Sequence, residues 1–150
     1  MAPLTITPVH PVLGARVEGV DLTVPLDAAT FGKIHDAFQE YSVLVFPGQQ
    51  LSDEQQMAFT TRFGPLETTI KSIGQERRLH ENMVDLSNVD PMGEGRLMGW
   101  SDRRMLYQSG NQLWHTDSSF KPVPALCSLL SGRVVPEAGG DTDFATARGA

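Results

Sequence analysis

The sequence is most informative at Asn111-Gln112-Leu113-Trp114-His115-Thr116-Asp117. His115 and Asp117 are two positions apart. On a helix this spacing points two side chains in nearly opposite directions, but on a strand it places them on the same face. A neighbouring imidazole nitrogen and carboxylate oxygen can bind one metal ion, and a second histidine would complete the two-histidine, one-carboxylate set of non-haem iron sites. The segment therefore predicts a strand with two metal ligands on one face and Trp114 packed on the other.

The same pair has a plainer interpretation. A histidine and an aspartate on one face of a surface strand can simply form a hydrogen bond with each other. The spacing of His115 and Asp117 does not separate this alternative from a metal site, so the surrounding sequence has to decide.

Two helices are expected before this segment. Asp27 is a favourable N-cap residue, and Leu26 can pack on Phe31 as a hydrophobic staple. The buried face of this first helix is predicted from residues at helical spacing, namely Phe31, Ile34, Phe38 and Tyr41. Ser52 and Gln55 form a capping-box pattern, which predicts a second helix ending near residues 64–65.

Apolar and β-branched residues between turn residues predict strands over 43–46, 84–89, 126–135 and 142–145, and residues 15–22 predict a short strand or an extended entry segment. The strand over 43–46 is expected to be buried. Residues 91–104 contain three glycines and little periodicity, which favours a long irregular loop. Together these elements predict an α+β domain with a sheet core and helices to one side.

Composition excludes several classes of protein. The formal charge is −6, from 12 Lys and Arg against 18 Asp and Glu, which argues against a nucleic-acid partner. No apolar run approaches the roughly 20 residues of a membrane span, and no secretory signal pattern is present, so we expect a cytoplasmic protein without a membrane partner. The single cysteine, Cys127, excludes an internal disulfide and a cysteine-based zinc site.

Longer stretches carry a family resemblance. Residues 114–120 read Trp-His-Thr-Asp-Ser-Ser-Phe, and residues 139–144 read Gly-Gly-Asp-Thr-Asp-Phe. Earlier in the chain, the runs at 14–22, 42–46, 51–56 and 62–67 belong to the same resemblance. In their order along the chain, these segments resemble the Fe(II)/2-oxoglutarate dioxygenase family of taurine dioxygenase and 2,4-dichlorophenoxyacetate dioxygenase. Residues 111–120 and 129–144 are most similar to its aryloxyalkanoate branch. The resemblance implies a jelly-roll-like double-stranded β-helix core with flanking helices.

The resemblance also implies roles for individual residues. His115 and Asp117 match two of the family's three Fe(II) ligands, and Thr142 matches the hydroxyl that holds the distal carboxylate of the cosubstrate 2-oxoglutarate. Asn111 matches a residue of the substrate pocket, and Lys71 matches a basic residue near the substrate carboxylate. The alternatives are a hairpin turn around Thr142, a loop asparagine bonded to its own backbone, and a solvated loop lysine.

The implied activity is hydroxylation of a small organic acid with dioxygen. The expected substrate is an aryloxyalkanoate such as 2,4-dichlorophenoxyacetate, and the runner-up is a sulfonate such as taurine. Since no remaining histidine matches the third ligand, residues 1–150 are expected to be the N-terminal portion of a single dioxygenase domain. The missing histidine and a 2-oxoglutarate-binding arginine would then follow. An inert truncated form that acts as an interaction module is the alternative, and homo-oligomerisation stays open.

Overall fold

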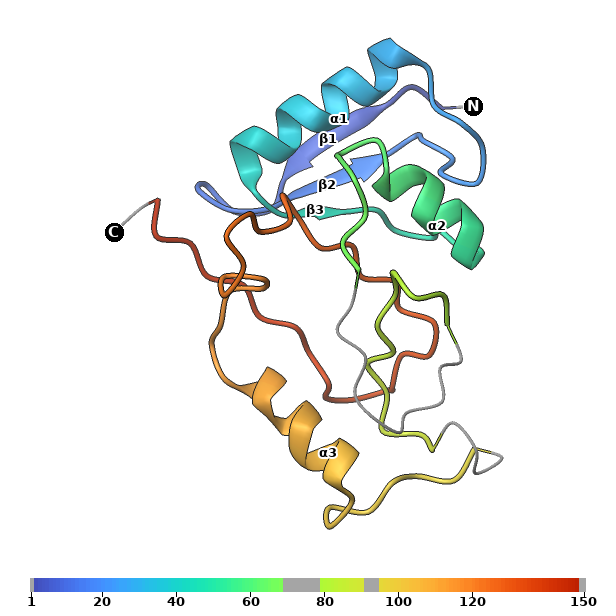
Figure 1. Ribbon diagram of the computed structural model, residues 1–150. Helices are drawn as coiled ribbons and strands as arrows, with labels where there is room; N and C mark the ends of the chain where they lie inside the picture. The colour runs from blue at the N-terminus through green and yellow to red at the C-terminus, as the bar shows by residue number, and fades with distance from the viewer. Residues whose placement is uncertain (1, 69–78, 91–94, 149–150) are drawn as a thin grey trace. The chain divides into compact units, whose positions relative to one another are not determined.

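The computed structural model describes residues 2–68, 79–90 and 95–148 (Figure 1). The chain forms two compact units. The first combines residues 1–63 with residues 129–150, and the second spans residues 64–128. Among the described residues, all strands and the two longest helices belong to the first unit. The α+β class is thus confirmed.

A mixed sheet of three short strands organises the first unit. Strand β1 (Thr5–Pro8) runs antiparallel to β2 (Ala15–Glu18), with Ile6 opposite Val17. Strand β2 runs parallel to β3 (Leu44–Val45), and helix α1 lies between them in the chain. The order β1-β2-β3 places β2 in the centre, which explains why its alternate residues are fully buried.

Strand β2 ends before Gly19 and is therefore shorter than the predicted strand over 15–22. Gly19 has φ +75°, and a Cβ atom at this position would lie 2.1 Å from the carbonyl oxygen of Pro3. Only glycine allows both the positive φ and this close approach of two backbone segments. The chain consequently leaves the extended conformation at this residue.

Helix α1 (Ala28–Tyr41) begins where the sequence predicts. Asp27 Oδ1 accepts the backbone N–H of Thr30 at 2.9 Å, which confirms the N-cap. Ile34 on this helix is fully buried and packs in a core with Val17, Leu22 and Phe59. Leu26, Phe31, Leu44 and Leu129 are among the partly buried side chains around that core.

Helix α2 (Asp53–Thr60) also confirms its predicted start. Ser52 Oγ accepts the Gln55 N–H at 3.2 Å, and Gln55 Oε1 accepts the Ser52 N–H at 2.8 Å. Phe59 is the buried residue of α2 and meets Phe63 edge to face, with ring centroids 5.5 Å apart. The helix ends at Thr60, before the predicted boundary at 64–65.

The expectation of a buried strand over 43–46 is only partly met, because the strand covers two residues and one of them is exposed. Leu44 packs against the core, whereas Val45 is 48% exposed. Strand β3 lies at the edge of the sheet, and successive side chains of a strand point to opposite faces. One face of β3 therefore meets the core and the other meets solvent.

The second unit is mostly irregular. It contains α3 (Arg103–Gln108) and the 3₁₀ helix Ser109–Gln112 (η1), neither of which the sequence predicted. Arg104 donates to both carboxylate oxygens of Asp102, at 3.0 and 2.7 Å, and to Asp90 at 3.1 Å. Bonding to Arg104 lowers the pKa of Asp102 to about 2. These bonds order the start of α3 within the predicted loop.

Three strand predictions are wrong. Residues 84–89 form only one isolated bridge, between Val89 and Leu97, and residues 126–135 and 142–145 form no strand. A strand needs a neighbouring strand for its backbone groups, and among the described residues these segments have no such neighbour beyond that bridge. The three-stranded sheet is accordingly smaller than the predicted double-stranded β-helix.

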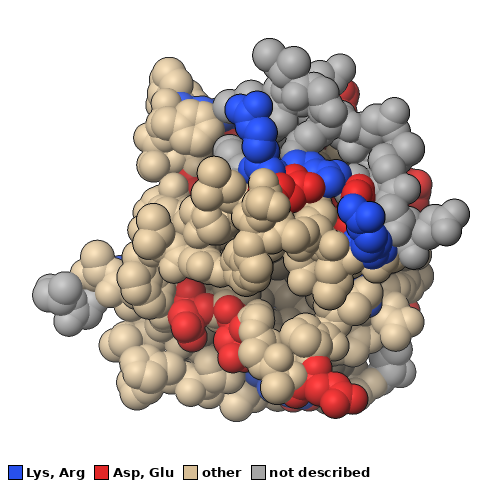
Figure 2. All heavy atoms as spheres, turned by 90° about the horizontal axis from the view of Figure 1, so that it is seen from below, with Lys and Arg blue, Asp and Glu red and all other residues tan. Residues whose placement is uncertain are grey.

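Several basic side chains are paired with acidic ones. Figure 2 shows acidic and basic side chains in small groups among uncharged residues on one face. Each described ion pair of Lys or Arg joins groups within one unit: Arg16–Glu18, Arg104–Asp90, Arg104–Asp102, Lys121–Glu67 and Arg133–Asp53. Within the described ranges, no helix is both long enough and apolar enough to cross a bilayer.

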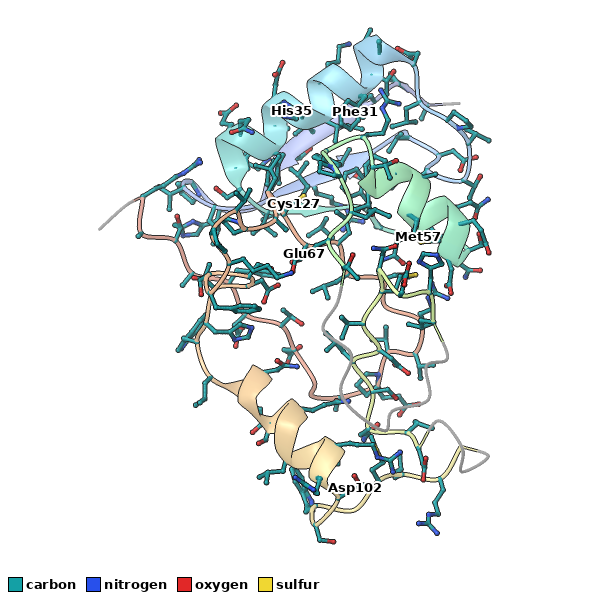
Figure 3. All side chains as sticks on the ribbon, viewed as in Figure 1. Phe31, His35, Met57, Glu67, Asp102 and Cys127 are labelled. Atoms are coloured by element: carbon teal, nitrogen blue, oxygen red, sulfur yellow. The ribbon has the colours of Figure 1, made fainter. Side chains whose placement is uncertain are left out.

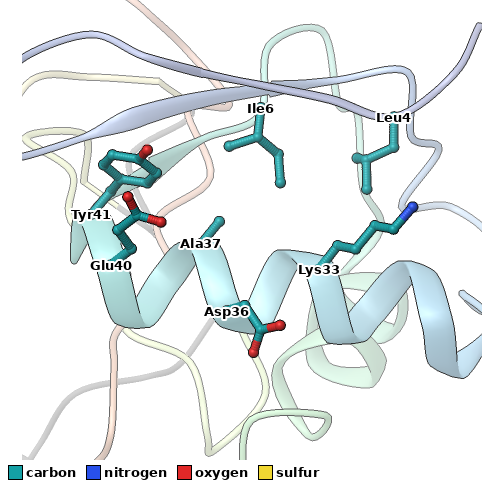
Figure 4. Close-up of a pocket in the computed structure, with 7 residues that line it drawn as sticks. All are labelled: Leu4, Ile6, Lys33, Asp36, Ala37, Glu40 and Tyr41. Carbon is teal, nitrogen blue, oxygen red and sulfur yellow. The ribbon is translucent and has the colours of Figure 1, made fainter.

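A shallow groove of about 360 Å³ lies between α1 and β1 (Figure 4). Its lining residues are Leu4, Ile6, Lys33, Asp36, Ala37, Glu40 and Tyr41. A hydrogen bond with Glu40 raises the pKa of the Tyr41 phenol. The groove contains none of the residues that the sequence predicts for a functional site.

Candidate metal centre

His115 and Asp117 lie together at the surface of the second unit. Their segment follows η1 and is irregular, so the predicted strand is wrong, yet Leu113 has extended dihedral angles of −95° and 144°. His115 Nε2 lies 3.2 Å from Asp117 Oδ1, and the two side chains are 49% and 60% exposed. The two side chains therefore meet as predicted, although the segment that carries them is irregular and not a strand.

The second carboxylate oxygen of Asp117 has its own partner. Ser128 Oγ donates to Asp117 Oδ2 at 2.7 Å. A hydroxyl bound to one oxygen fixes the rotation of the carboxylate and leaves the other oxygen, Oδ1, directed at His115. The Asp117 side chain is thus oriented before any ligand arrives.

The imidazole of His115 is oriented in the same way. Its Nδ1 lies 2.7 Å from the carbonyl oxygen of Leu113. A carbonyl oxygen only accepts hydrogen bonds, so Nδ1 must carry the proton, and a neutral ring presents a lone pair at Nε2. That lone pair faces the carboxylate oxygen Oδ1 of Asp117. The arrangement needs a positive charge between the two atoms, either a proton or a metal ion.

The 3.2 Å separation fits two adjacent ligands of one metal ion. Nitrogen and oxygen ligands lie about 2.1 Å from a first-row metal, so two of them at a right angle are about 3.0 Å apart. A protonated His115 bonded directly to Asp117 fits the same distance, which keeps the plainer interpretation open. If a metal ion is bound, the hydrogen bond from His115 Nδ1–H to a backbone carbonyl is the usual support of a metal-binding histidine.

Among the described residues, no third ligand joins the pair. All four histidines lie within the described ranges, and no group of three or more His, Cys, Asp or Glu side chains that could hold a metal occurs there. His80 Nδ1 accepts the N–H of Asn82 at 3.3 Å, and His35 stacks on Phe63 with ring centroids 6.3 Å apart. The described residues therefore bring together two side chains of the ligand types found in a facial iron site, which requires three protein ligands.

The loop after Asp117 has an anchor that sequence reasoning missed. Ser118 Oγ donates to Glu67 Oε2 at 2.8 Å, and Lys121 Nζ bonds Glu67 Oε1. These bonds, with that of Lys121 the strongest influence, lower the pKa of Glu67. The partners are 51 and 54 residues apart in sequence, and no local pattern signals such a contact.

For the other predicted site residues, the structure gives position and exposure only. Asn111 lies exposed in η1 of the second unit. Thr142 lies exposed in the first unit, after Gly139 and Gly140, which have φ values of +74° and +75°. The glycine turn is thus present, but no hairpin flanks it among the described residues. Lys71 lies outside the described residues.

Trp114 does not pack in the core as predicted. It is 74% exposed, and nearby Phe120 and Val123 are 71% and 83% exposed. A side chain is buried only where another layer covers it, and no described layer of the second unit covers these residues.

Comparison with known proteins assigns the family. The family model for taurine catabolism dioxygenase, described as the TauD, TfdA family, matches residues 5–150. The chain belongs to this family of 2-oxoglutarate-dependent dioxygenases. The resemblance noted in the sequence is therefore confirmed.

Two curated relatives illustrate the similarity. The alpha-ketoglutarate-dependent 2,4-dichlorophenoxyacetate dioxygenase of Cupriavidus pinatubonensis is 41% identical over 145 residues, which cover 95% of this chain and 50% of that protein. The (S)-phenoxypropionate/alpha-ketoglutarate-dioxygenase of Sphingobium herbicidovorans is 41% identical, over 97% of this chain and 46% of that protein. The chain spans about half the length of the curated relatives it matches.

A solved structure supports the fold. The crystal structure of AAD-2 in complex with Mn(II) and N-oxalylglycine has a TM-score of 0.68 and 33% sequence identity to this chain. The similarity covers 82% of this chain and 39% of the other. The two units thus carry part of the fold of this family.

Proposed function

We propose that residues 1–150 form the part of a Fe(II)- and 2-oxoglutarate-dependent dioxygenase that contributes His115 and Asp117 to the iron. The observation that carries the proposal is the 3.2 Å approach of His115 Nε2 to Asp117 Oδ1. Leu113 and Ser128 hold the far atoms of these side chains, which leaves the facing atoms free to bind a cation.

Each residue has a limited task in this proposal. When bound, Fe(II) and 2-oxoglutarate would supply the electrons that activate dioxygen, with 2-oxoglutarate oxidised to succinate and carbon dioxide. His115 offers a neutral nitrogen, and Asp117 contributes one negative charge that offsets part of the metal's charge. The hydroxyl of Thr142 donates to the distal carboxylate of 2-oxoglutarate, as a hydroxyl on a glycine-flanked turn can.

The remaining parts of the site are proposed to come from sequence beyond residues 1–150. The described residues offer two ligands, and the relatives are about twice as long as the matched region. A third histidine and an arginine for the 2-oxoglutarate carboxylate would complete the site. Further strands would extend the three-stranded sheet into the double-stranded β-helix.

The proposed substrate is an aryloxyalkanoate. Support comes from the 41% identity to enzymes named for 2,4-dichlorophenoxyacetate and phenoxypropionate. The reaction would replace a C–H bond beside the ether oxygen with C–OH, while 2-oxoglutarate and dioxygen yield succinate and carbon dioxide. The resulting hemiacetal would collapse to a phenol and an aldehyde or keto acid. Lys71 is proposed to pair with the substrate carboxylate and Asn111 to orient the substrate.

The test is a comparison of substrates with the complete gene product. We expect succinate and a phenol to form in equal amounts from 2-oxoglutarate and 2,4-dichlorophenoxyacetate. Taurine tests the sulfonate alternative, and absence of succinate with both would favour an inert interaction module. A Lys71→Ala variant should raise KM for the aryloxyalkanoate and leave KM for 2-oxoglutarate nearly unchanged, since only the first loses its charge partner.

A further inference from the structure

One carboxylate is bound at two points along the loop that begins at the candidate ligand Asp117. Ser118 Oγ donates to one oxygen of the Glu67 carboxylate, and Lys121 Nζ bonds the other. Asn82 Nδ2 donates to the backbone carbonyl of Glu67 at 3.1 Å. Glu67, labelled in Figure 3, is therefore held at its backbone by Asn82 and bonded through its side chain to Ser118 and Lys121 of the loop.

The 117–128 loop is closed by a bond between its two ends. Ser128 Oγ donates to Asp117 Oδ2 at 2.7 Å, so the far end of the loop is bonded to the Asp117 carboxylate. The Lys121 N–H donates to the Ser118 carbonyl at 2.9 Å and forms a turn directly after Asp117. The position of this turn decides where the carboxylate lies relative to His115.

The backbone at Ser118 needs support. Its φ is +56°, in the left-handed region that residues other than glycine adopt only when their surroundings hold them there. The hydroxyl of Ser118 donates to Glu67 Oε2 at 2.8 Å and provides such support. The side chains of Lys121 and Glu67 are 25% and 30% exposed, so their ion pair is partly shielded from solvent.

We infer that Glu67 is a positioning residue for Asp117, which holds the 117–128 loop so that Asp117 Oδ1 can share a metal ion with His115. The inference rests on the proposed function, because it assumes that Asp117 binds a metal. Glu67 touches neither ligand directly and acts through Ser118 and Lys121. Its replacement should therefore weaken metal binding while both ligands are still present.

The test measures Mn(II) binding to the metal-free complete gene product, with free Mn(II) followed by electron paramagnetic resonance. We expect Glu67→Gln and Ser118→Ala each to raise the Kd for Mn(II) about tenfold. This is the lower end of the loss in affinity that is typical when a residue supporting a metal ligand is replaced. Glu137→Gln and Ser119→Ala are the matched controls, since both residues are exposed and neither side chain forms a hydrogen bond among the described contacts. The controls should keep the wild-type Kd.

A second measurement separates positioning from folding. Thermal unfolding of the metal-free variants reports stability alone. If Glu67→Gln does not fold, the Kd and the unfolding midpoint of Ser118→Ala are used to test the inference. A lowered unfolding midpoint with an unchanged Kd in Ser118→Ala would mean a purely structural contact and would overturn the inference. If wild type and His115→Ala bind Mn(II) equally, the proposed function fails. If His115→Ala abolishes binding and both test variants bind normally, only the role of Glu67 fails.

Discussion

The hydroxyl of Ser128 donates to Asp117 Oδ2 at 2.7 Å, while the other oxygen of that carboxylate faces His115 Nε2 at 3.2 Å. Ser128 therefore holds one oxygen of the carboxylate, and the other oxygen faces His115. A freely rotating Asp117 would present either oxygen to the metal and would bind it less often in the required geometry.

Ser128→Ala should therefore weaken metal binding with no change in the ligand set. We expect the Kd for Mn(II) to rise about tenfold, because bonds that orient a ligand typically contribute at least this much to affinity. Ser131→Ala serves as the control, since it removes a hydroxyl a few residues along the chain. Equal affinity in Ser128→Ala and Ser131→Ala would show that the bond does not orient the ligand.

Gly19 and Gly32 should respond to alanine with opposite signs. At Gly19, a Cβ would lie 2.1 Å from Pro3 O and the φ of +75° would be strained, so we expect a loss of at least about 1–2 kcal/mol in the free energy of unfolding. At Gly32, inside α1, a Cβ meets nothing within 4 Å, and we expect a gain of about 0.5–1 kcal/mol. Urea unfolding of both variants measures these changes. A stable Gly19→Ala variant would contradict the described contact with Pro3.

The carboxyl group of Asp102 should titrate near pH 2, well below its ordinary value of 3.8, because Arg104 stabilises the charged form. Because the pKa is lower in the folded state, the ionised carboxylate stabilises the fold at pH values above the pKa of the unfolded state. This contribution is lost as the pH falls towards 2. Carboxyl chemical shifts from NMR measure the midpoint. Arg104→Ala should move the midpoint back towards 3.8, whereas Arg103→Ala should leave it near 2. Identical midpoints in these two variants would contradict the pairing.

The parts of the fold that the sequence predicts are those with local causes. The caps at Asp27 and Ser52 each involve a partner three residues away, so the pattern contains both members of the contact. The strand predictions over 126–135 and 142–145 failed because a strand depends on a distant partner. An apolar, β-branched segment shows a preference for extended backbone, and it carries no information about which strand pairs with it.

The candidate site shows the same division. Residues His115 and Asp117 meet as their spacing predicts, although the strand expected to present them is an irregular extended segment. The supports of the pair were not predictable from spacing. Ser128 contacts Asp117 across 11 residues and Lys121 contacts Glu67 across 54, and serine, lysine and glutamate are common in ordinary solvated loops.

The most direct test of the metal assignment is an anaerobic titration of the complete gene product with Fe(II) and 2-oxoglutarate, followed by visible absorption. The wild-type protein should develop the charge-transfer band of an iron-bound 2-oxoglutarate, and His115→Ala and Asp117→Ala should not. His80→Ala is the matched control, because His80 belongs to the same unit and, among the described contacts, its imidazole bonds only the backbone N–H of Asn82. A band of wild-type strength in His115→Ala, or its loss in His80→Ala, would contradict the assignment.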